Sequence, residues 1–210
     1  MNTLDYITQK FSLDLTQPSP VNIESVNRKV MAETLAELGF TVGAEIGVAA
    51  GDHSKTLLES IPSLTLYCVD TWTADRSYWS FRSSTLANWY ELAKIALSPY
   101  PNCIIKKQTS MEVARSIPNE TLDFVYIDAA HDFKNIAMDI CEWSKKVRPG
   151  GIVYGHDYTV KFARQYACHV KYIVDAYMWS YQISPWFVLG ENRRPNRTGV
   201  NDIPEWLYIK

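Results

Sequence analysis

The sequence lacks the features that mark membrane-spanning, disulfide-bonded or strongly charged proteins. Its four cysteines are scattered and form no Cys-x-x-Cys pair, so we expect reduced thiols. No apolar run approaches the roughly 20 residues of a membrane span, and no secretory signal opens the chain. The formal net charge is only −2, so no overall field recruits nucleic acid or an anionic membrane. These absences predict a cytoplasmic protein without nucleic-acid or membrane partners.

The composition is otherwise that of a soluble globular domain with an excess of aromatic residues. A chain of 210 residues is long enough for one domain with a sizeable core. Aromatic residues make up 13% of it and concentrate in residues 72–100 and 154–206. We expect most of them to pack in the core, although aromatic clusters near a site also line apolar substrate pockets. The aromatic C-terminal part is also compatible with a homodimer.

Segments with helical spacing of apolar residues alternate with short apolar runs typical of buried strands. The expected helices are 21–40, 54–60, 86–97, 111–116, 133–147 and 161–178, and the expected strands are 41–46, 64–69, 103–106, 122–127, 152–155, 181–184, 186–189 and 206–209. This order predicts an α/β, Rossmann-like three-layer sandwich, with a mostly parallel seven-stranded sheet and a C-terminal antiparallel hairpin. Within it we expect an N-terminal helical cap at 1–40, a ligand-binding domain at 41–210 and a lid at 71–98.

Ligands of such sheets bind beyond the carboxyl ends of the strands. In this sequence acidic residues end four of the expected strands. They are far apart along the chain, but strand order would bring them to one rim. These strand-end positions are Glu45–Gly47, Asp70, Asp128 and His156-Asp157.

A glycine turn follows the first central strand, in the segment Glu45-Ile46-Gly47-Val48-Ala49-Ala50-Gly51. A dinucleotide site needs Gly-x-Gly-x-x-Gly, and the middle glycine is missing. Glu45 also places a carboxylate at the mouth of the turn, where it would repel a pyrophosphate. Asp70 ends the next strand, where it could accept hydrogen bonds from a ribose or, alternatively, cap the next helix. The spacing therefore disfavours a nicotinamide oxidoreductase.

The segment 45–51 resembles motif I of class I S-adenosylmethionine-dependent methyltransferases. Asp70 matches the ribose-binding acid of that family, Thr109-Ser110-Met111 the segment lining the adenine, and 122–131 the fourth-strand motif. The turn at 148–151 matches the one before strand five, so the resemblance spans about 42–158. It implies S-adenosyl-L-methionine as cofactor, with the binding residues Glu45, Gly47, Val48, Gly51, Asp70, Thr71, Ser110, Met111 and Asp128.

Two further motifs are similar to a subfamily of small-molecule and sugar O-methyltransferases, which includes macrolide-sugar O-methyltransferases, cephalosporin-hydroxylase-type proteins and, more distantly, catechol O-methyltransferases. They are Ile-Asp-x-x-His at 127–131 and Gly-Gly-x-x-x-Gly-His-Asp-Tyr at 150–158. Several of those relatives hold a divalent metal, which implies Asp128, His156 and Asp157 as ligands here. His156 departs from their second acid. The implied cation is Mg²⁺ or Mn²⁺, but because magnesium prefers oxygen ligands, His156 weakens the case for Mg²⁺ and leaves room for Mn²⁺, iron or no metal.

Methyl transfer needs a nucleophilic oxygen held near the methyl group and a means of removing its proton. A metal bound to Asp128 and Asp157 could lower the pKa of a hydroxyl. Without a metal, His131 or His156 could act as the base. His131 could instead brace the loop before the helix at 133. The catalytic candidates are therefore His131, Asp128 and His156, whereas we expect His53 at a helix start and His169 inside the last helix.

Substrate selection is assigned to the aromatic insert 71–82, with Arg76 and Arg82, and to the basic loop 192–197. Both segments could equally be solvated loops. The Asn/Asp-Pro-Pro-Tyr tetrapeptide of amino-directed nucleic-acid methyltransferases is absent. We therefore expect methyl transfer to a hydroxyl of a small molecule or sugar. The open alternatives are a cofactor-binding pseudoenzyme or regulatory protein, and an N-methyl or aminopropyl transferase on the same fold.

Overall fold

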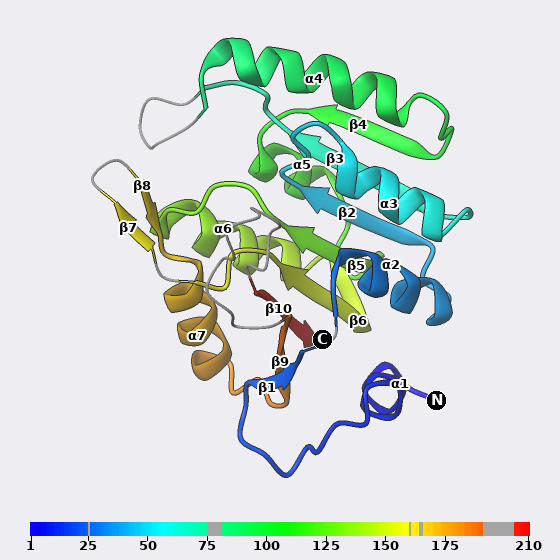
Figure 1. The fold of residues 1–210 in the computed structure, drawn as a ribbon, viewed down its shortest axis with the longest axis vertical. Coiled ribbons are helices and arrows are strands. Elements are labelled where there is room, and N and C mark those ends of the chain that lie inside the picture. Colours follow the sequence, from blue (N-terminus) through cyan, green and yellow to red (C-terminus); the bar gives the residue numbers. More distant parts are fainter. Residues whose placement is uncertain (25, 75–80, 160, 164–165, 191–203) are drawn as a thin grey trace.

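The computed structural model describes all residues except 25, 75–80, 160, 164–165 and 191–203. A central sheet is covered by helices on both faces (Figure 1). The strands of the central sheet are β1 Val21–Ile23, β2 Val42–Ile46, β3 Thr65–Asp70, β4 Cys103–Lys107, β5 Leu122–Ile127, β6 Val147–Gly155, β9 Trp186–Leu189 and β10 Glu205–Ile209. The helices are α1 Thr3–Lys10, α2 Arg28–Glu37, α3 Asp52–Ser60, α4 Ser83–Leu97, α5 Ser110–Ser116, α6 Phe133–Ser144 and α7 Val170–Ser180.

The strands follow the order β1-β9-β10-β6-β5-β2-β3-β4. Every neighbouring pair is parallel except those of β10, which runs antiparallel to both β6 and β9. The Rossmann-like α/β class and the C-terminal antiparallel hairpin are thus confirmed. The sheet has eight strands rather than seven, because Val21–Ile23 pairs with β9 at the edge.

The alternation of side chains along each strand divides the core into two layers. On one face the buried residues Phe124 and Tyr126 of β5 pack with α1, α2, α3 and α4. On the other face Val125 and Ile127 of the same strand pack with α5, α6 and α7. The N-terminal helices therefore share the core of the sheet. The first residue of α2 lies close to the end of β5 and the start of β10.

Several expected elements were wrong: the expected helix 133–147 ends at Ser144, and the expected turn at 148–151 lies within β6. The expected helix 21–40 begins only at Arg28, because the Asn27 side chain caps it by accepting hydrogen bonds from the N–H groups of residues 29 and 30. The expected helix 161–178 is a hairpin of β7 Lys161–Ala163 and β8 Tyr166–Cys168 followed by α7. There the His169 N–H donates to the His131 carbonyl, a tertiary bond that no local pattern announces. Residues 181–184, expected as a strand, lie in the turn after α7.

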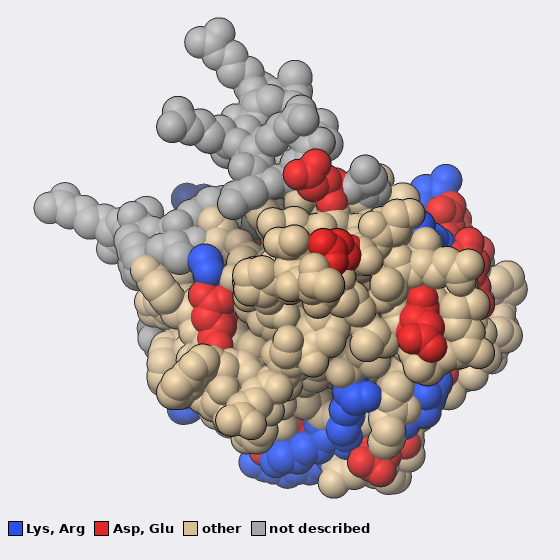
Figure 2. Space-filling model, turned by 90° about the horizontal axis from the view of Figure 1, so that it is seen from below, with Lys and Arg blue, Asp and Glu red and all other residues tan. Residues whose placement is uncertain are grey.

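The remaining bulk expectations concern cysteines and membranes. All four cysteines are free. Across the described ranges no helix combines the length and apolarity needed to cross a bilayer. Figure 2 shows a largely uncharged face with scattered acidic groups, on which Lys and Arg lie mostly along the lower edge, with others at the left and upper right.

The core of β5 yields a test of the layer arrangement. Phe124 is fully buried, and its ring packs against Gly43. A Cβ added at Gly43 would lie 2.2 Å from Cζ of Phe124. Phe124→Ala should lower the free energy of unfolding by about 3–5 kcal/mol, because it leaves a cavity beside β2. Phe133→Ala, on a ring that is 65% exposed, should change it by less than about 0.5 kcal/mol. Urea unfolding measures both, and equal effects would contradict the assignment of layers.

Candidate active site

The glycine turn after β2 is pressed against the end of β5. Gly47 has φ +94°, and its N–H donates to the Val69 carbonyl at 2.8 Å. A Cβ at this position would lie 2.0 Å from the carbonyl oxygen of Asp128. Only glycine allows this approach, since any side chain would force the two strand ends apart. The turn and Asp128 are therefore parts of one site.

Asp70 holds the glycine turn in place. Its Oδ2 accepts hydrogen bonds from the N–H groups of Val48 and Ala49, both at 3.0 Å. Its Oδ1 accepts from the N–H of Trp72 at 2.8 Å. The Trp72 indole then donates to the Ala49 carbonyl at 2.8 Å, so that this buried ring closes over the turn. Ribose binding by Asp70, with Thr71 beside it, stays a prediction.

Glu45 does not lie at the mouth of the turn, and that expectation is wrong. Its side chain follows the alternation of β2 into the layer beneath α3, where the Ser54 hydroxyl donates to the carboxylate. The residue is only 2% exposed, and burial raises its pKa to about 8. Glu45 is therefore poorly placed to repel a pyrophosphate. The missing middle glycine remains the argument against a dinucleotide.

The predicted adenine segment begins α5. Thr109 caps the helix in a reciprocal capping box with Glu112. The Ser110 hydroxyl donates to Asp139 of α6 and accepts from the Trp143 indole N–H at 2.7 Å. Burial raises the pKa of Asp139 to about 7. This tie fixes the start of α5 against α6, while contact of Ser110 and Met111 with adenine stays a prediction.

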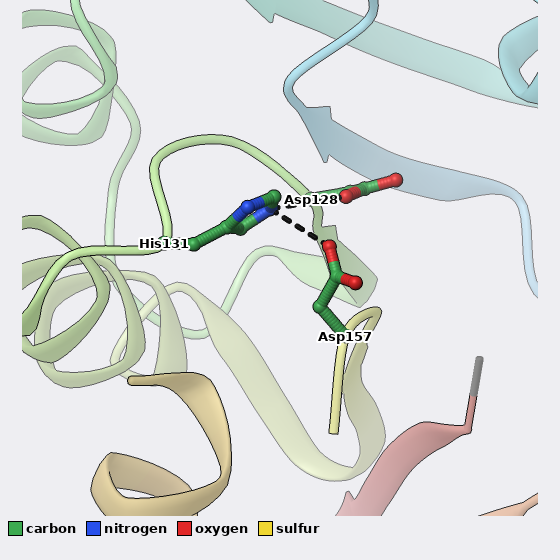
Figure 3. A group of neighbouring side chains, drawn as sticks. All are labelled: Asp128, His131 and Asp157. Carbon is green, nitrogen blue, oxygen red and sulfur yellow. Dashed lines mark ion pairs between the residues drawn. The ribbon is translucent and has the colours of Figure 1, made fainter. Parts of the chain in front are cut away.

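Acidic and imidazole side chains converge beyond β5 and β6 (Figure 3). His131 Nε2 lies 3.0 Å from Asp157 Oδ2 and 3.6 Å from Asp128 Oδ1. His156 Nδ1 lies 3.4 Å from the same Asp157 oxygen and 3.7 Å from the same Asp128 oxygen. Of the residues expected on this rim, the structure brings Asp128, His156 and Asp157 together, and His131 joins them.

Asp128, His131 and Asp157 offer one ligand atom each, and these atoms lie within 4.8 Å of one another. The ligand set predicted from the sequence contained His156 in place of His131. Two carboxylates and an imidazole are a donor set that suits manganese, iron or zinc better than magnesium, which prefers oxygen alone. These residues fit a divalent cation.

The charges of the cluster stabilise one another. Burial acts to raise the pKa of Asp128, but the His131 hydrogen bond and the positive charges of His156 and Arg28 hold it below its usual value. Burial acts to lower the pKa of His131 and His156. Hydrogen bonds to Asp128 and to Asp157, respectively, outweigh it and raise both. The two carboxylates therefore make both imidazoles stronger bases than a free imidazole.

Sequence reasoning missed Arg28, the first residue of α2. Its Nη2 lies 2.7 Å from Asp128 Oδ2, and its Nε lies 3.4 Å from Oε1 of the buried Glu205. Its guanidinium carbon stands 5.4 Å from the centre of the Tyr126 ring. The Tyr126 hydroxyl donates to the same Glu205 oxygen at 3.0 Å. The helix cap at Asn27 is a sequence signal for where α2 begins, but nothing in the sequence shows what Arg28 meets.

The other two histidines, His53 and His169, lie at the starts of helices. His53 is the second residue of α3, which confirms its expected place at a helix start. It packs against Tyr126 with ring centroids 4.3 Å apart, and burial lowers its pKa to about 3, so it stays neutral. His169 precedes α7 instead of lying inside the helix. Of the substrate candidates, Arg76 and 192–197 lie outside the described residues, while Arg82 immediately precedes α4.

Comparison with known proteins assigns the fold. The methyltransferase domain family matches residues 44–158, more than half of the chain. No curated protein matches with significance. The O-methyltransferase from Bacillus cereus in complex with SAH is 16% identical with a TM-score of 0.60, covering 99% of this chain and 90% of that one. The O-methyltransferase TomG from Streptomyces achromogenes, in complex with SAM, is 16% identical with a TM-score of 0.58, covering 99% and 88%.

An rRNA methylase from Streptococcus thermophilus is nearly as similar in structure, with 9% identity, a TM-score of 0.59, and coverage of 89% of this chain and 98% of that one. Likeness at this level shows the fold and leaves the acceptor open. The match over 44–158 covers the glycine turn, Asp70 and the Asp128–Asp157 cluster. The chain therefore belongs to the methyltransferase domain family and is an S-adenosylmethionine-dependent methyltransferase.

Proposed function

We propose that the protein transfers a methyl group from S-adenosylmethionine to a hydroxyl of a small molecule or sugar, with help from a divalent cation. One observation carries this proposal: the contact between Gly47 and the Asp128 carbonyl sets the cofactor turn directly beside a cluster of acids and imidazoles. A methyl group held by the turn would thus face groups able to orient and deprotonate an acceptor.

The roles follow from the distances. Asp128, His131 and Asp157 would hold the cation, which when bound lowers the pKa of an acceptor hydroxyl. With His131 among the ligands, His156 is the imidazole left to take the proton, and Asp157 orients it at 3.4 Å. Without a cation, His131 is oriented by Asp157 at 3.0 Å and serves as the base. Either arrangement accepts one proton for each methyl group transferred.

A small acceptor is favoured over nucleic acid by charge. The net charge is −2, and the basic groups visible in Figure 2 lie along the lower edge and at separate points on the left and upper right. Nucleic-acid binding proteins instead gather Lys and Arg into a patch or stripe. The cytoplasmic location and the homodimer remain predictions.

Asp70→Asn should weaken binding of S-adenosylmethionine at least tenfold, because it removes the charge that holds the turn through Val48 and Ala49. Titration calorimetry measures this, with NAD as a ligand expected to bind far less well. Asp14→Asn, on an exposed acid bonded only within its own loop, is the matched control. The absence of heat with S-adenosylmethionine for the unaltered protein would overturn the proposal.

A panel of hydroxyl acceptors (catechol, caffeic acid and simple sugars) with methyl-labelled S-adenosylmethionine should reveal at least one methyl ether. His131→Ala and His156→Ala should each lower kcat, the true base by about 10²–10⁴-fold, while cofactor affinity changes little. His53→Ala is the control, since that imidazole is buried and neutral. Cofactor binding without any methylated product across the panel would favour the pseudoenzyme alternative.

A chelator should lower the rate on the best acceptor, and Mn²⁺ should restore it more fully than Mg²⁺, because one of the three ligand atoms is an imidazole nitrogen. Asp157→Ala should remove the response to added metal. Unchanged activity both in chelator and in Asp157→Ala would show that transfer proceeds without a cation.

A further inference from the structure

We propose that Arg28 is a displaceable counter-ion of Asp128: it occupies this carboxylate in the cation-free protein and moves onto Glu205 when a divalent cation binds. The inference rests on the proposed function, because the cation site is the one assigned there. It gives α2 a positioning role in that site.

The first resting place of Arg28 is shown by its contacts. Nη2 lies 2.7 Å from Asp128 Oδ2, whereas the two imidazoles approach the other oxygen, Oδ1, from 3.6 and 3.7 Å. The guanidinium and the cation-binding side therefore share one carboxylate. A cation held by Asp128 would therefore compete with Arg28 for the negative charge of this carboxylate.

The second resting place is the unused half of Glu205. Oε1 accepts from the Tyr126 hydroxyl at 3.0 Å and already lies 3.4 Å from Arg28 Nε. Oε2 is buried and, among the described residues, has no hydrogen-bond partner. Leaving a buried carboxylate oxygen unpaired is costly, so a donor is expected there in some state of the protein. A guanidinium can pair with both carboxylate oxygens at once through its planar fork.

The route between the two places is short and supported. The guanidinium carbon of Arg28 lies 5.4 Å from the centre of the Tyr126 ring, so the guanidinium can shift across the face of the ring without losing this contact. Tyr126 is itself held between His53 and Tyr154, with ring centroids 4.3 and 4.7 Å away. Meanwhile the Asn27 cap fixes the backbone at the start of α2. Only the Arg28 side chain needs to move.

Competition of this kind predicts opposite effects for the two partners. Arg28→Met frees Asp128 and should tighten Mn²⁺ binding by about tenfold, roughly the worth of one charge-assisted pair. Glu205→Gln weakens the second resting place, so Arg28 stays on Asp128 and Mn²⁺ should bind several-fold more weakly. In the double variant Arg28→Met/Glu205→Gln, the effect of Glu205 should vanish, because it acts through Arg28.

The measurement is calorimetric titration of the full-length protein with MnCl₂, checked by circular dichroism and by S-adenosylmethionine binding. Arg148→Met is the matched control. Arg148 pairs with Asp123 at 2.7 Å and covers the Phe40 ring at 5.1 Å, with similar exposure, but beside the start of β5 and β6. It should leave Mn²⁺ affinity unchanged. Should Arg28→Met fail to fold, Arg28→Lys, which keeps the charge without the fork, should bind Mn²⁺ more tightly by a smaller factor.

Unchanged or weaker Mn²⁺ binding in the folded Arg28 variant would overturn the inference. So would additive effects in the double variant, since a plain electrostatic field adds whereas an exchange of partners does not. Binding in Arg28→Met but not in the unaltered protein would support it. Absence of Mn²⁺ binding in every variant would overturn it too, and cofactor titration would still decide the proposed function independently.

Discussion

The whole site depends on the close approach of two backbones, the glycine turn after β2 and the end of β5. Gly47 admits the Asp128 carbonyl into the space of its missing side chain. Asp70 then anchors the turn from the neighbouring strand, and the parallel pairing of β5 with β6 brings His156 and Asp157 beside Asp128. Donor turn and acid cluster thus share one rigid frame, so their spacing is set by the sheet and not by mobile loops.

The sequence predicted those parts of the site that are local to a strand end. Apolar runs predicted the strands, and topology alone then placed Asp128, His156 and Asp157 on one rim. His131 was found from the motif that follows Asp128. The orientation of Glu45 was missed because it depends on which layer a strand residue faces, here the one holding Ser54. The start of α7 was missed because a bond from His169 to the distant His131 carbonyl determines it.

The contacts of Arg28 were likewise not predictable from local sequence patterns. Its sequence neighbours predict only a helix, and its partners Asp128 and Glu205 lie far along the chain. They meet at the rim beyond the carboxyl ends of β5 and β6. There β10, which runs antiparallel to β6, begins and brings Glu205 to the rim. Such contacts follow from the completed topology. They could be recognised only once the strand order was known.

The ion pair between Arg28 and Asp128 joins the part of the chain that matches the family to a segment outside it. The family match spans 44–158, which contains Asp128, His131 and Asp157 but neither Arg28 nor Glu205. A chain cut to residues 44–158 would keep Asp128 and Asp157 but lose the Arg28 guanidinium that pairs with Asp128. The flanking segments therefore tune a shared centre from outside, so two chains with the same motifs can differ in ionic character at the reacting group.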